Sequence, residues 1–132
     1  QLFMSKYPYS YLVDSCNVNI KDLRSRLELK SFEKAKLYYK MEKYRSAIIA
    51  LNTTLTKFPD TKFREEIYFM ILKANYLFAF NSVETKKVER FEETIKSYHN
   101  FVDYFSKSSN LKTAETYFST SVKEIEKLKT LN

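Results

Sequence analysis

Apolar residues recur along this chain at the spacing of one face of a helix, and the clearest case is the stretch 35–61. Its main stripe is Tyr44, Ala47, Ile48, Leu51, Leu55 and Phe58. A shorter stripe of Ala35, Tyr38 and Tyr39 precedes it, and the polar turn 40–43 lies between them. Pro59 cannot continue helical hydrogen bonding, and Asp60 and Thr61 can cap the next helix. The stretch predicts two helices folded back on each other.

The same periodicity predicts a long helix before this hairpin, over residues 10–41, with Ser10 as its cap. Residues 1–8 are interpreted as the tail of an earlier repeat, ended by Pro8. The long helix begins with the stripe Leu12, Cys16, Ile20, Leu23 and Leu27. The stripe slips phase at Leu29 and then resumes, so we expect a bend over 29–31 where the helix changes its packing partner. On this stripe, Cys16 is predicted to be a buried core thiol.

Further helices are predicted at 44–58, 62–81, 84–105 and 110–129. The stripe of helix 62–81 is Phe63, Ile67, Met70, Ala74 and Leu77. The stripe of helix 84–105, the fourth along the chain, is Val88, Phe91, Ile95, Tyr98, Val102 and Phe105. The stripe of helix 110–129 is Leu111, Ala114, Phe118, Val122, Ile125 and Leu128. The regular steps of the fourth stripe favour packing along one narrow seam.

Three predicted helix ends share a sequence of an aromatic residue, a break and a hydroxyl. They are Tyr7-Pro8-Tyr9-Ser10, Phe58-Pro59-Asp60-Thr61 and Phe105-Ser106-Lys107-Ser108, separated by 51 and 47 residues. Helix hairpins that recur behind such ends are typical of a solenoid of stacked repeats.

The composition supports an all-α fold in a single domain of 132 residues with no glycine and two prolines. Without glycine, phosphate-binding loops of the Walker and dinucleotide types are excluded. The longest apolar run, residues 67–72, is too short to span a bilayer. The net charge of +7 is interspersed rather than gathered in a tail, which is typical of a solvated helix surface. Binding to nucleic acid is a lesser alternative, and attraction to an anionic membrane surface or to an acidic partner is comparable to it.

The stretch 35–61 resembles a tetratricopeptide repeat. The matching positions are Ala35, Tyr38, Ala47, Leu51 and Pro59, whereas the usual early tryptophan is missing and Thr54 stands where alanine is common. The wider pattern is YP-x-S before a long helix, then AKLYY, then FPDT-K-x-REE. This pattern resembles the C-terminal half of the BamD family in its Bacteroidetes-like form.

The BamD resemblance implies a right-handed superhelix of antiparallel helix pairs, as the C-terminal fragment of a longer protein. It implies a non-enzymatic scaffold of the outer-membrane β-barrel assembly machinery, at the periplasmic face of the outer membrane. The lipid anchor would lie in an N-terminal part absent from this chain. The implied partners are the POTRA domains of a BamA-like protein, other lipoproteins of the complex and unfolded outer-membrane proteins. The alternative is another periplasmic tetratricopeptide adaptor that binds cell-envelope proteins.

No catalytic constellation, cofactor site or metal site is predicted. His99 is the only histidine, and partly buried or groove-facing packing is expected for it. The neighbouring pairs Glu65-Glu66 and Glu92-Glu93 point about 100° apart on a helix, so they are poorly placed to share a proton. We interpret the first pair as favourable charges at a helix N-terminus.

Partner contacts are predicted just after Pro59, where the family pattern is strongest. Lys62, Arg64 and Glu65 form a polar helix start, and Arg64 can place its guanidinium fork on a carboxylate of a partner. The plain alternative is a solvated first turn. Tyr38, Tyr39, Tyr68 and Tyr76 are either core residues or part of an inner binding face. The predicted partner-binding set is Lys62, Arg64, Glu65, Tyr68 and Tyr39.

Overall fold

The computed structural model describes residues 9–130, with side chains from Asn19 onward, and these residues form an all-helical fold. The helices are α1 (Tyr9–Lys40), α2 (Tyr44–Lys57), α3 (Arg64–Phe80), α4 (Glu84–Tyr104) and α5 (Leu111–Thr130). Each begins and ends within two residues of its predicted range. The expected tail of an earlier repeat at residues 1–8 lies outside the described part.

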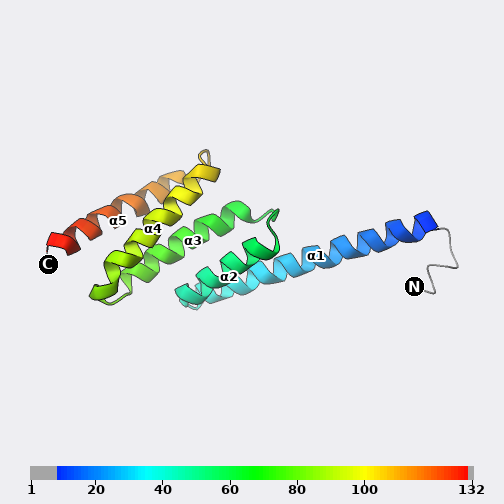
Figure 1. Ribbon diagram of the computed structural model, residues 1–132, viewed down its shortest axis with the longest axis horizontal. Coiled ribbons are helices and arrows are strands. Elements are labelled where there is room, and N and C mark those ends of the chain that lie inside the picture. Colours follow the sequence, from blue (N-terminus) through cyan, green and yellow to red (C-terminus); the bar gives the residue numbers. More distant parts are fainter. Residues whose placement is uncertain (1–8, 131–132) are drawn as a thin grey trace.

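Consecutive helices run antiparallel and pack side by side, and α3 also contacts α5 (Figure 1). One core cluster lies where α1, α2 and α3 meet; its buried residues are Phe32, Ala35, Leu51, Ile67 and Ile71. A second joins α3, α4 and α5 through Leu72, Phe101 and Ala114. Because α3 contributes to both clusters, it is apolar around most of its circumference.

The N-terminal half of α1 extends beyond α2 (Figure 1), and this corrects one prediction. Ile20 is 63% exposed and Leu27 is 51% exposed, and Leu23 between them is exposed as well. The stripe that we expected to be buried is therefore solvent-facing at these residues, because α2 has only 14 residues and covers the other half of α1. Burial begins at Phe32, just after the phase slip, and α1 runs through 29–31 without a break in the helix. The Cys16 side chain lies outside the described residues.

The α1–α2 turn makes a left-handed conformation without glycine. The Lys43 N–H donates to the Tyr38 carbonyl and the Glu42 N–H to the Tyr39 carbonyl, each at 3.0 Å. This pair of bonds is the Schellman arrangement, which places the residue after the cap in the left-handed region. That residue is Glu42, at φ 60°. A side chain with a Cβ there costs roughly 1–2 kcal/mol.

The buried face of α4 is wider than the predicted seam and is rotated from it. Phe91 on the seam is buried, but Phe101, which the stripe did not include, is fully buried too. Thr94 and Ser97 are also buried, and Ser97 accepts a hydrogen bond from the Asn75 amide at 2.7 Å. The seam prediction was wrong because α4 contacts both α3 and α5, so residues on two flanks of the helix lose solvent.

The α2–α3 and α4–α5 loops repeat the same geometry 47 residues apart. Phe58 and Phe105 end their helices with φ near −130° in both cases. The Thr61 N–H donates to the Phe58 carbonyl at 3.0 Å, and the Ser108 N–H to the Phe105 carbonyl at 3.1 Å. In both loops the hydroxyl also accepts from the backbone N–H two residues later. Two of the three predicted helix ends are therefore the same structure; the first begins outside the described residues.

Candidate protein-docking site

The loop between α2 and α3 is fastened to α1 through Glu28. The Thr61 hydroxyl donates to the Glu28 carboxylate, and the Lys62 N–H donates to the same oxygen at 3.3 Å. Thr61 is buried, so its hydroxyl needs such a partner. The prediction that Asp60 or Thr61 caps α3 is wrong: the cap residue is Phe63, which makes no side-chain capping bond. The Thr61 hydroxyl donates to Glu28 and accepts from the Phe63 N–H, which lies just before the first turn of α3.

Arg24 makes a second connection between α1 and the same loop. Its guanidinium donates to the Lys57 carbonyl at 3.4 Å and lies 3.6 Å from the Asp60 carboxylate. It also lies 5.0 Å from the centre of the Phe58 ring, a cation–π distance. Asp60 is therefore paired with Arg24 rather than used as a helix cap. These contacts fix the loop that precedes the predicted contact residues.

Arg64 lies in an aromatic corner that we call the turn patch, made of Arg64, Tyr68 and Tyr104. Its guanidinium donates to the Pro59 carbonyl at 2.9 Å and to the Tyr68 hydroxyl at 3.0 Å. It lies 5.1 Å from the ring centres of both tyrosines. Tyr104 is 61% exposed, so one wall of the patch faces solvent. Because guanidinium has five N–H donors, two internal bonds leave others for a partner carboxylate.

A second group of side chains gathers from α1, from the start of α2, and from α3 and α5. We call it the tyrosine–lysine face; it consists of Tyr39, Tyr44, Lys73, Tyr76 and Tyr117. The Lys73 ammonium lies 5.8 Å from the centre of the Tyr39 ring, and Tyr39 meets Tyr44 edge-on at 5.7 Å. Tyr76 and Tyr117 are tilted against each other at 4.4 Å. This arrangement presents a cation among several phenol groups.

Three phenols of this face, those of Tyr39, Tyr44 and Tyr117, have a raised pKa. Burial raises the pKa of Tyr39 and of Tyr117 above the ordinary value of 10.0. At Tyr117, Lys73 acts to lower the pKa, whereas Tyr39 and Tyr76 act to raise it. Burial is also the main cause of the raised pKa of Tyr44, with Glu42 adding to it. Neutral phenols beside an ammonium group can donate hydrogen bonds to a carboxylate or a carbonyl.

The structure brings together some of the predicted contact residues and separates others. Arg64 and Tyr68 touch each other, and Lys62 lies beside them, exposed, with its ammonium 5.3 Å from the Phe63 ring centre. Glu65, half-buried, and Glu66, exposed, lie in the first turn of α3. Tyr39 belongs instead to the tyrosine–lysine face.

Sequence reasoning assigned no partner-binding role to Tyr104, Lys73 or Tyr117. Lys73 and Tyr117 carry no local signal, because they meet Tyr39 only through the packing of three helices. Tyr104 had one available signal: it stands next to Phe105 at a repeated helix end. The four tyrosines whose role the sequence left open lie in three different places. Tyr68 lies in the turn patch, Tyr39 and Tyr76 lie in the tyrosine–lysine face, and Tyr38 points into a groove between α1 and α2.

His99 is exposed, which corrects the expectation of partly buried packing. Its ring meets Tyr98 at 5.4 Å and Phe118 at 5.6 Å, on the rim of the α4–α5 contact. Within the described residues, no group of three or more His, Cys, Asp or Glu side chains is placed to hold a metal ion. None of the helices over residues 9–130 is long and apolar enough to cross a membrane.

Comparison of the chain with models of known protein families gives no match, and comparison with the sequences of characterised proteins gives none either.

Proposed function

We propose that this chain is a non-enzymatic docking scaffold built from tetratricopeptide-like repeats. More particularly, we propose that it is a BamD-like component of the outer-membrane β-barrel assembly machinery. In this role it binds periplasmic POTRA domains of a BamA-like partner, at the periplasmic face of the outer membrane. The turn patch and the tyrosine–lysine face supply the contact residues.

The repetition of the Phe58 and Phe105 loops is the observation that carries this proposal. Equal loops 47 residues apart, together with the contact between α3 and α5, favour a right-handed superhelix of stacked helix pairs. The period exceeds the 34 residues of a standard tetratricopeptide repeat because α3 and α4 have 17 and 21 residues. Repeats of this type use cross-helix surfaces for protein binding rather than a catalytic cleft.

The loop that carries the FPDT-K-x-REE pattern supports the same role. Glu28 and Arg24 hold this loop against α1, and the loop in turn positions Arg64 and Tyr68. Arg and Tyr are enriched among the residues that dominate protein interfaces. A rigid loop that presents them loses little conformational entropy on binding.

The proposal is tested by measuring binding of this chain to purified POTRA domains of a BamA-like protein from a Bacteroidetes species, by biolayer interferometry. We expect binding that Tyr104→Ala and Arg64→Lys weaken on the order of tenfold, since interface anchors contribute 2 kcal/mol or more. Arg45→Lys, on the exposed surface of α2, is the matched control and should bind as the unmodified chain does.

No binding to the POTRA domains, or equal binding of all variants, would contradict the proposal. Recovery of a different envelope protein that is lost with Tyr104→Ala would favour the alternative periplasmic adaptor.

A further inference from the structure

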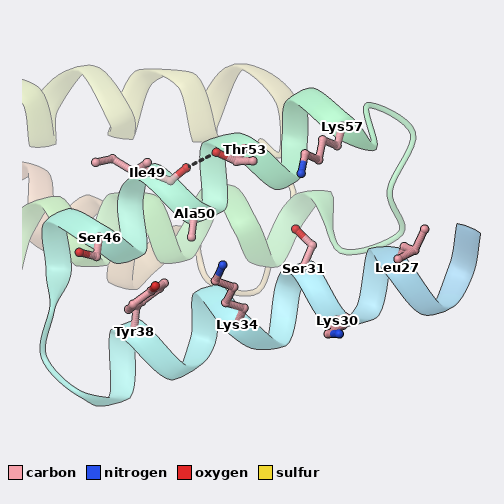
Figure 2. Close-up of a pocket in the computed structure, with 10 residues that line it drawn as sticks. All are labelled: Leu27, Lys30, Ser31, Lys34, Tyr38, Ser46, Ile49, Ala50, Thr53 and Lys57. Atoms are coloured by element: carbon pink, nitrogen blue, oxygen red, sulfur yellow. Dashed lines mark hydrogen bonds between the residues drawn. The ribbon is translucent and has the colours of Figure 1, made fainter.

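A groove separate from both surfaces above runs between α1 and α2, with a volume of ≈ 460 Å³. Its ten lining residues all belong to these two helices, and Figure 2 looks into it. From α1 come Leu27, Lys30, Ser31, Lys34 and Tyr38; from α2 come Ser46, Ile49, Ala50, Thr53 and Lys57. We call this feature the α1–α2 groove.

The groove is long enough to hold one helix, and it combines small, apolar and basic side chains. Small residues, Ser31, Ser46 and Ala50, lie along its length, so another backbone can approach closely. The larger aliphatic lining residues are Leu27, 51% exposed, and Ile49, 58% exposed. From Leu27 to Tyr38 the groove follows α1 for about 17 Å at 1.5 Å per residue.

The exposed stripe of α1 extends this binding surface beyond the end of α2. Leu27, Leu23 and Ile20 follow one another at helical spacing and all face solvent. Groove and stripe together extend about 27 Å along α1, the length of an 18-residue helix. Exposed apolar surface of this length is typical of an interaction site.

The charged side chains that line the groove are all of one sign. Lys30, Lys34 and Lys57 line it, and none of the ten lining residues is acidic. In Figure 2, Lys34 points from α1 toward α2 and Lys57 points back toward α1. The ion pairs found within residues 19–130 are Arg24–Asp60 and Arg26–Asp22, so they involve none of these lysines. The ammonium groups are therefore available to carboxylates of a partner.

We propose that the α1–α2 groove binds an acidic amphipathic helix of a partner protein. Its apolar stripe would lie on Leu27, Ile49 and the exposed stripe, and its flanking Glu or Asp residues would face the groove lysines. This goes beyond the proposed function, because it adds a second binding site whose existence does not depend on POTRA docking. The site would let one scaffold hold two partners at once.

Other occupants fit the groove less well. Phosphate groups of nucleic acid would meet the lysines but would leave Ile20, Leu23 and Ile49 without an apolar partner. An anionic lipid surface offers both charge and acyl chains, but it is flat, whereas a helix can lie lengthwise in a groove between two helices. A second copy of this chain carries the same net charge of +7, so the two basic surfaces would repel. The combination of exposed apolar side chains and lining lysines matches an acidic amphipathic helix on both counts.

The test uses the full chain and a fluorescein-labelled 18-residue peptide with leucine on one helical face and glutamate on both flanks. We expect binding by fluorescence anisotropy that weakens as salt is raised. Lys34→Glu combined with Lys57→Glu should weaken it on the order of tenfold or more. Ile49→Ser should weaken it separately, without changing charge. The matched control is Lys96→Glu combined with Lys123→Glu, at exposed positions of α4 and α5. Circular dichroism verifies that every variant is folded.

Several results would overturn the inference. A peptide of the same composition with its leucine stripe scrambled should fail to bind. If it bound equally well, the interaction would depend on charge alone and not on an amphipathic helix. Unchanged binding in the groove variants would show that the peptide lies elsewhere. Binding of phosphatidylglycerol vesicles or of single-stranded DNA that is lost in these variants, with no peptide binding, would assign the groove to anionic lipid or to nucleic acid. Self-association in sedimentation experiments that the groove variants abolish would assign it to a second copy of the chain.

Discussion

Ser31 of α1 and Thr54 of α2 share a hydrogen bond of 2.6 Å between their hydroxyl groups, inside the contact of the two helices. Thr54 is fully buried and also lies 3.0 Å from the carbonyl of Ala50 on its own helix. The threonine hydroxyl is accommodated at this fully buried position because it has a partner on the facing helix.

Thr54→Val should lower the free energy of unfolding by about 1–2 kcal/mol, since it removes this bond and leaves the Ser31 hydroxyl without its partner. Urea denaturation followed by circular dichroism measures the change. Thr56→Val is the matched control, because the exposed Thr56 makes the same intrahelical bond, to Asn52 at 3.0 Å. A loss at Thr56 as large as that at Thr54 would show that the bond to α1 contributes nothing.

Glu42→Gly should raise the stability by roughly 0.5–1 kcal/mol, because glycine adopts the left-handed conformation without a Cβ clash. The same measurement on Glu42→Ala should show no gain, since alanine keeps the Cβ. Glu92→Gly, in the exposed middle of α4, should instead lose about 1 kcal/mol. If Glu42→Gly were destabilising, the left-handed geometry of this turn would be wrong.

Glu28→Ala should lower the free energy of unfolding by about 1–3 kcal/mol, because the buried Thr61 hydroxyl loses its acceptor. Glu33→Ala, at an exposed position one and a half turns further along α1, provides the reference and should be near neutral. Since the loop positions Arg64, Glu28→Ala should also weaken the proposed binding to POTRA domains without changing a contact residue. Equal stability of the two variants would argue against the Glu28 connection.

The raised pKa values of Tyr39, Tyr44 and Tyr117 predict a loss of stability at alkaline pH. These phenols bind protons more tightly in the folded chain than in the unfolded one, so their ionisation lowers the free energy of unfolding. This loss is absent at neutral pH and appears as pH rises past the ordinary value of 10.0. Urea midpoints should be flat from pH 7 to about 9 and then fall.

Replacing both Tyr39 and Tyr117 with phenylalanine should reduce this alkaline loss, whereas Tyr104→Phe, at an exposed position, should leave it unchanged. If the urea midpoint fell equally in the unmodified chain, in the double variant and in Tyr104→Phe, groups other than Tyr39 and Tyr117 would cause the alkaline loss of stability.

The helices and their bounds could be predicted because helical periodicity is a local property of the sequence. The exposure of Ile20, Leu23 and Leu27 could not, because a stripe shows which face can be buried but not whether a neighbour covers it. The burial of Phe101 depends on α4 having neighbours on two flanks. Similarly, Asp60 and Thr61 have the composition of a cap, but Glu28 and Arg24, more than 30 positions earlier, bind them instead.

The position of α3 in both cores has a consequence for how the chain unfolds. Ile71 and Leu72 are adjacent in sequence, yet the first belongs to the cluster with α1 and α2 and the second to the cluster with α4 and α5. Opening either cluster exposes one side of α3 and removes support for the other, so the two halves should unfold cooperatively. In hydrogen exchange, the amides of α3 should exchange only through global unfolding, whereas those of residues 20–27 in α1 should exchange through local opening.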